Sequence, residues 1–89
     1  MTLETAILSF LAARYPAAFE AAVIRTRINR SGAIDKTVTD ADVTEVLLRL
    51  ANRFGKVELI TRDDGVQYWS ATPKGVSAWT LDGSPYIGG

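Results

Sequence analysis

The ten basic side chains are the residues of this sequence best suited to a function, and the chemistry they offer is the binding of anions. The 89-residue chain contains no His and no Cys. This excludes His-based triads, Cys nucleophiles, thiolate or imidazole metal sites and disulfides. The Ser, Lys, Tyr and acidic side chains have no spacing typical of an active site. The sequence therefore predicts a binding protein that is not an enzyme and that needs no cofactor or metal.

The basic residues concentrate in the middle of the chain. Ten Lys and Arg balance ten Asp and Glu overall, so no net field draws the chain to nucleic acid or to an anionic membrane. Residues 14–62, however, carry nine basic and six acidic side chains. Spaced arginines are also commonly solvated or paired, here with Glu20 and Asp35, so both interpretations stay open. The candidate DNA-contacting residues are Arg25, Arg27, Arg30, Thr44, Arg49, Asn52, Arg53, Lys56, Arg62 and Lys74.

Hydrophobic spacing predicts three helices in the first part of the chain. Apolar residues recur every three and four positions over 2–14, 17–30 and 40–54, which is the period of a helix with a buried face. Thr39 followed by Asp42 resembles a capping box, so the third helix has the best-defined start. Gly55 supplies its end.

The pattern changes to a period of two beyond the third helix. β-Branched and aromatic residues flank Asp64-Gly65, which predicts a hairpin of strands 56–62 and 66–71 around Asp63-Asp64-Gly65, with a register that stays open by one residue. Thr72-Pro73 then predicts the start of a short helix that ends at Leu81. Residues 82–89 contain three glycines and a proline, which predicts a flexible tail.

This order of elements resembles a winged helix-turn-helix domain over residues 3–81. It is an α+β fold, mostly α, with three helices, a β-hairpin wing and a short C-terminal helix. Arg49-Leu50 and the step Thr72-Pro73-Lys74-Gly75 are similar to PadR-like and MarR-like regulators. The resemblance implies a recognition helix over 40–54 that enters the major groove, with phosphate contacts from the preceding helix and the wing. We expect a small DNA-binding transcriptional regulator, with duplex DNA as partner and a homodimer as one assembly.

The predicted recognition helix also carries features that favour a protein partner. A turn of 100° per residue points five side chains outward: Ala41, Glu45, Leu48, Asn52 and Arg49. The acids Asp40, Asp42 and Glu45 would repel a duplex. The alternative function is therefore a protein-interaction module of the same fold. A two-residue turn would place Ile60 near Trp69, although Trp69 could equally cover the edge of the core. The apolar anchors of this alternative are Leu48, Ile60, Trp69 and Tyr86.

The sequence predicts no membrane partner. The most apolar run, residues 6–13, is far shorter than the roughly 20 residues that cross a bilayer. The chain opens Met1-Thr2-Leu3-Glu4, whereas a secretory signal begins with basic residues. We therefore expect a cytoplasmic protein.

Overall fold

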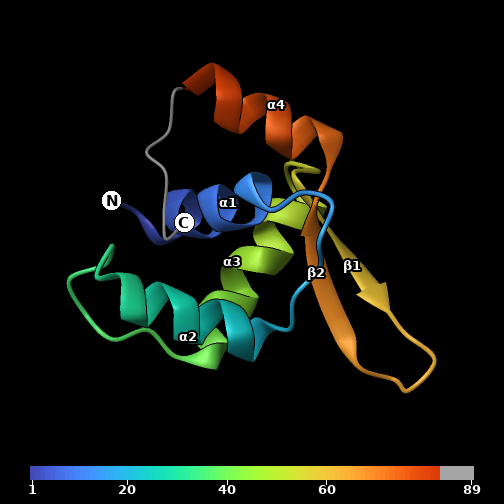
Figure 1. Cartoon of the computed structure of the whole chain (residues 1–89), viewed down its shortest axis with the longest axis horizontal. Helices are drawn as coiled ribbons and strands as arrows, with labels where there is room; N and C mark the ends of the chain where they lie inside the picture. Colours follow the sequence, from blue (N-terminus) through green and yellow to red (C-terminus); the bar gives the residue numbers. More distant parts are fainter. Residues whose placement is uncertain (83–89) are drawn as a thin grey trace.

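The elements follow one another in the order of a winged helix (Figure 1). The computed structural model describes residues 1–82, so the predicted tail and its Tyr86 lie outside the described residues. The fold is α+β and mostly α, as predicted. The elements are α1 (Leu3–Ala13), α2 (Ala21–Ser31), α3 (Asp40–Asn52), β1 (Val57–Thr61), β2 (Gln67–Ala71) and α4 (Pro73–Asp82).

Helix α1 is the centre of the core. Every residue from Ala6 to Ala12 is buried, which is the pattern of a helix covered on all sides. It packs against α2, α3, α4 and β2, and in Figure 1 it runs between α4 on one side and α2 with α3 on the other. Its large apolar side chains, such as Ile7 and Phe10, each contribute about 1.5–3 kcal/mol through burial. The other elements are positioned by this helix.

Helix α2 begins at Ala21, four residues later than predicted. Phe19 instead lies beside β2, where its N–H donates to the Trp69 carbonyl (2.9 Å) and its carbonyl accepts from the Trp69 N–H (2.7 Å). The Phe19 ring also packs edge-on against Phe10, with 5.1 Å between the centroids. This pairing with a distant strand outweighs the helical preference of the alanines at 17 and 18. The wing is therefore joined to the segment between α1 and α2.

Helix α3 has the start that the sequence predicts. Thr39 and Asp42 form the capping box, with each side chain bonded to the backbone N–H of the other residue. The apolar stripe Val43, Val46, Leu47 and Leu50 is buried. The helix ends at Asn52 rather than at residue 54, and Gly55, with φ of 65°, turns the chain into β1. A left-handed residue after a helix is a common stop, and glycine adopts it without strain.

The capping box makes the stability of the domain sensitive to acid. The backbone N–H of Thr39 lowers the pKa of Asp42 below its usual value of 3.8, and the Thr39 hydroxyl and the charge of Lys36 act in the same direction. Because the folded pKa is depressed, this stabilisation is present above about pH 4 and is lost as the pH falls through the folded pKa. We expect Asp42→Asn to flatten the fall in unfolding free energy below pH 4. A carboxyl titration by NMR that placed the Asp42 midpoint at or above 3.8 would contradict this.

The hairpin has a three-residue loop, so its register differs by one residue from that of a two-residue Asp64-Gly65 turn. Arg62 N–H donates to the Val66 carbonyl (3.0 Å) and Gly65 N–H donates to the Arg62 carbonyl (2.8 Å). Gly65 has a φ of 81°, which is typical of a turn followed by a glycine bulge. Trp69 consequently pairs with Leu59, not with Ile60. A shift of one residue moves every side chain to the other face, and Trp69 is thereby placed in the core.

Within residues 1–82, no helix is both long enough and apolar enough to cross a membrane.

Candidate nucleic-acid interface

The outer face of α3 is exposed, as the helical period predicts, but it is not basic. Ala41, Glu45, Leu48 and Asn52 all lie on the surface, and Leu48 is 44% exposed. Asp40 is exposed at the beginning of the same helix. A duplex approaching the first half of α3 would meet two carboxylates and a leucine, which attract neither phosphates nor most base edges.

Two of the arginines predicted to contact DNA are in ion pairs. Arg25 on α2 pairs with Asp40 at the start of α3. Arg49 on α3 pairs with Glu4 of α1, and its second nitrogen lies 3.5 Å from Glu45. The prediction that Arg25 pairs with Glu20 or Asp35 is therefore wrong. The packing of α2 on α3 places Asp40 beside Arg25 instead. Such exposed pairs add little stability, but they balance the charge of both arginines locally.

Six of the predicted cations have no ion-pair partner within residues 1–82. They form three groups: two arginines on the exposed side of α2, one arginine at the tip of the wing and three cations at its base. The remaining polar candidates lie on α3, where Thr44 is half-buried and Asn52 is exposed. The six unpaired cations are Arg27, Arg30, Arg53, Lys56, Arg62 and Lys74.

The base of the wing is a tightly bonded junction of four elements. Lys56 N–H donates to the Leu50 carbonyl of α3 (2.9 Å), and Thr72 N–H donates to the Lys56 carbonyl (3.0 Å). The Thr72 hydroxyl donates to the Gly55 carbonyl (2.7 Å) and accepts from the Gly75 N–H in the first turn of α4 (3.1 Å). Figure 1 shows the start of α4 beside the end of α3 and the start of β1. These bonds fix the chain on both sides of Gly55.

Three unpaired cations gather around this junction. The Arg53 guanidinium carbon lies 5.5 Å and the Lys56 Nζ 5.3 Å from the centre of the Phe54 ring. The Lys74 Nζ lies 4.0 Å from the point where a Cβ on Gly55 would stand. We call Arg53, Lys56 and Lys74 the wing-base cluster. Sequence reasoning assigned these residues to DNA, but their convergence depends on the contact between α4 and the start of β1.

The tip of the wing is electrostatically mixed. Arg62 stacks over the ring of Tyr68, with 4.6 Å from its guanidinium carbon to the ring centre. Asp63 and Asp64 follow it in the exposed loop, and Asp64 accepts the Val66 N–H (2.9 Å). One cation beside two carboxylates makes the tip of the wing a weaker contact for DNA phosphates than the base of the wing.

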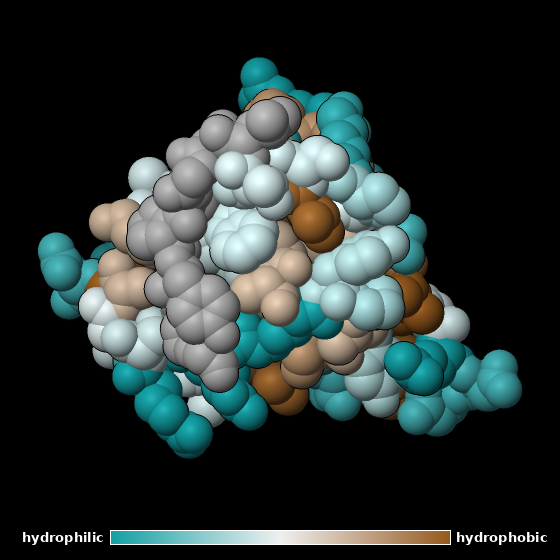
Figure 2. Space-filling model, turned by 45° about the horizontal axis from the view of Figure 1, so that its top comes forward, coloured by the Kyte–Doolittle hydropathy of each residue, from teal (hydrophilic) through white to brown (hydrophobic). Residues whose placement is uncertain are grey.

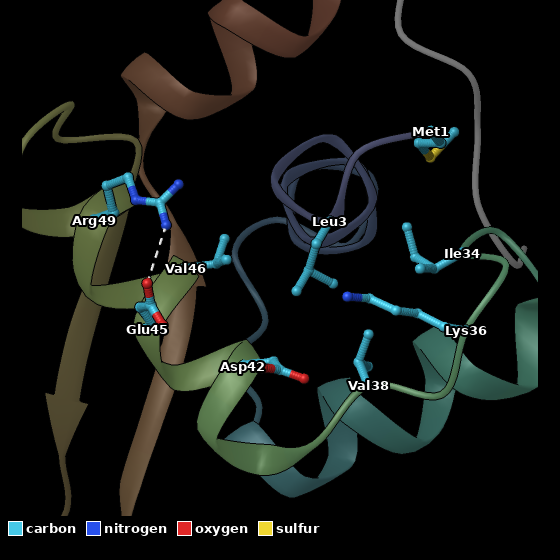
Figure 3. Close-up of a pocket in the computed structure, with 9 residues that line it drawn as sticks. All are labelled: Met1, Leu3, Ile34, Lys36, Val38, Asp42, Glu45, Val46 and Arg49. Atoms are coloured by element: carbon cyan, nitrogen blue, oxygen red, sulfur yellow. Dashed lines mark hydrogen bonds and ion pairs between the residues drawn. The ribbon is translucent and has the colours of Figure 1, made fainter.

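A hollow of about 350 Å³ lies between the start of α1, the loop before α3 and one side of α3. Figure 3 shows Leu3, Ile34, Val38 and Val46 around the hollow, with the Lys36 side chain reaching into it between Leu3 and Val38 and with Glu45 and Arg49 at one side. Lys36 and Arg49 are matched there by Asp42 and Glu45. The hollow therefore has no excess charge with which to attract an anion.

The apolar anchors of the protein-interaction alternative are not gathered on one surface. Leu48 is exposed and Ile60 is half-buried, whereas Trp69 is only 3% exposed and belongs to the core. Of the two interpretations that the sequence leaves open for Trp69, the structure has the one in which it covers the core, because the three-residue loop turns it inward. Leu59, opposite Trp69, is 41% exposed instead. On the face shown in Figure 2, the described hydrophobic residues form separate spots between hydrophilic ones.

Comparison with protein-family models, with curated proteins and with solved structures finds no match to this chain.

Proposed function

We propose that this chain is a small cytoplasmic winged-helix module that binds duplex DNA, in keeping with its resemblance to PadR-like and MarR-like regulators. One observation carries the proposal: six of the eight basic residues assigned to DNA have no acidic partner within residues 1–82. Unpaired cations release counterions from DNA when they contact phosphates, and this supplies most of the affinity of non-specific binding.

The acidic outer face of α3 bears on whether the protein reads the base sequence or contacts only the phosphate backbone. Asp40 and Glu45 would lie near phosphates if α3 entered the major groove by its first half. Contacts to phosphate fix the position of a protein on the duplex but carry no sequence information. The proposed binding is therefore dominated by the backbone, with a Kd of about 10⁻⁴ to 10⁻⁶ M at physiological salt.

Fluorescence anisotropy of a labelled duplex of about 20 base pairs tests this function. We expect binding at about 50 mM salt that weakens about fortyfold or more at about 200 mM, as counterion release requires for three or more phosphate contacts. Two unrelated duplex sequences should bind equally. Native mass recorded in parallel would show whether a homodimer forms.

Arg25→Gln serves as a control for the titration of the natural chain, because it removes an arginine whose charge Asp40 already balances. We expect this variant to keep the salt slope of the natural chain. Absence of binding at 50 mM salt would overturn the proposed function and direct attention to a protein partner for the exposed face around Leu48.

A further inference from the structure

The wing-base cluster differs from the other exposed cations in how it is built. Arg53 and Lys56 lie in the short loop between α3 and β1, and Lys74 lies in the first turn of α4. The hydrogen bonds of Thr72 to Gly55, Lys56 and Gly75 hold these segments together. These bonds hold the backbone that carries the three cations, and like charges gathered on one part of the surface attract an anion. Within the described residues, no acidic side chain pairs with any of the three.

The step Thr72-Pro73-Lys74-Gly75 has a geometric role in this arrangement. Thr72 caps α4 and bonds to Gly55. A Cβ on Gly75 would stand 2.9 Å from the Lys56 carbonyl carbon and closer still to its oxygen. Glycine therefore allows α4 to begin directly against the start of β1, and Lys74 is carried to the side of Gly55.

Resting on the proposed function, we propose that the wing-base cluster is the main phosphate anchor of the protein, and that DNA crosses the end of α3 and the start of α4. The first half of α3, with Asp40 and Glu45, then lies away from the duplex. The ligand is the sugar-phosphate backbone of duplex DNA, recognised by three cations whose backbone segments are bonded together.

The other free cations are weaker candidates for this role. Arg27 and Arg30 both lie on the exposed side of α2, whereas Lys74 and Lys56 come from two segments that Thr72 joins. Arg62 stands beside Asp63 and Asp64 at the tip of the wing. A preorganised group of cations loses less freedom on binding than separate flexible side chains do.

The test compares two triple variants that lose the same charge. One is Arg53→Gln/Lys56→Gln/Lys74→Gln at the base of the wing. The other is Arg27→Gln/Arg30→Gln/Lys36→Gln, three cations that have no ion pair within residues 1–82. The probe is the same labelled duplex, titrated at several salt concentrations. We expect the first variant to lose more than about tenfold in affinity and up to three units of salt slope, since each phosphate contact contributes about 0.9.

We expect the control variant to lose clearly less affinity and less salt slope than the wing-base variant, because Arg27 and Arg30 are the weaker phosphate contacts and the loss of net charge is the same. The charge-preserving variant Arg53→Lys/Lys56→Arg/Lys74→Arg should bind like the natural chain. Circular dichroism verifies that each variant is folded.

The outcomes separate the two proposals. A natural chain that binds no DNA contradicts the proposed function itself. A natural chain that binds DNA while the wing-base variant keeps its affinity, or while both triple variants lose it equally, overturns the anchor and leaves DNA binding intact.

Discussion

Replacement of Gly75 by alanine is expected to destabilise the domain by about 2–3 kcal/mol or more. The added Cβ would stand 2.9 Å from the Lys56 carbonyl carbon. Real Cβ contacts are essentially never below 3.0 Å, and because the obstacle is backbone it cannot rotate aside. Overpacking of this kind typically costs about 1–3 kcal/mol. In a free helix the same change would stabilise by about 1 kcal/mol. A loss of stability would therefore indicate that the added Cβ collides with the Lys56 backbone.

Urea and thermal unfolding followed by circular dichroism measure this effect. A loss of 2 kcal/mol corresponds to a fall of roughly 10 °C in Tm for a domain of this size. Ser77→Ala is the matched control, because it changes an exposed position of the same helix and should alter Tm little. An unchanged or raised Tm for Gly75→Ala would mean that α4 does not begin against Lys56. The contact that brings Lys74 to the other two residues of the wing-base cluster would then be absent.

The parts of the fold that local chemistry determines could be predicted from the sequence. Helix α3 is the clearest case, because Thr39 and Asp42 cap it within three residues and its apolar stripe has a single period. The predicted strands also exist, as does α4 after Thr72-Pro73. Each of these depends on residues that are neighbours along the chain.

The errors concern contacts between distant segments. The late start of α2 reflects the pairing of Phe19 with Trp69, fifty residues further along the chain. The register of the wing stayed open in the sequence because Asp-Gly suits both a two-residue turn and a three-residue loop with a glycine bulge. Only the packing of Trp69 into the core selects between these loops.

The same distinction applies to the candidate site. The helical period correctly predicted that Glu45 and Leu48 point outward. It gave no indication that Arg49 would pair with Glu4, since the two residues are 45 positions apart. The convergence of Lys74 on Gly55 likewise depends on the packing of α4, which composition and periodicity do not report.

Trp69→Ala is expected to cost about 3–5 kcal/mol, the usual range for removing a buried tryptophan. The side chain is 3% exposed and belongs to the main core. Trp69 also joins Phe19 to β2 through two backbone hydrogen bonds. Because domains of this size are stable by only about 5–15 kcal/mol in total, the variant should unfold at much lower urea concentration and could be largely unfolded at 37 °C.

Leu59→Ala is the matched control for Trp69→Ala. Leu59 is the direct cross-strand partner of Trp69 but is 41% exposed, so its truncation removes less buried surface and should cost clearly less. The comparison distinguishes the two possible registers of the wing. If Trp69→Ala cost no more than Leu59→Ala, Trp69 would lie at the surface, the pairing of Ile60 with Trp69 would be restored, and a protein partner would regain its largest apolar anchor.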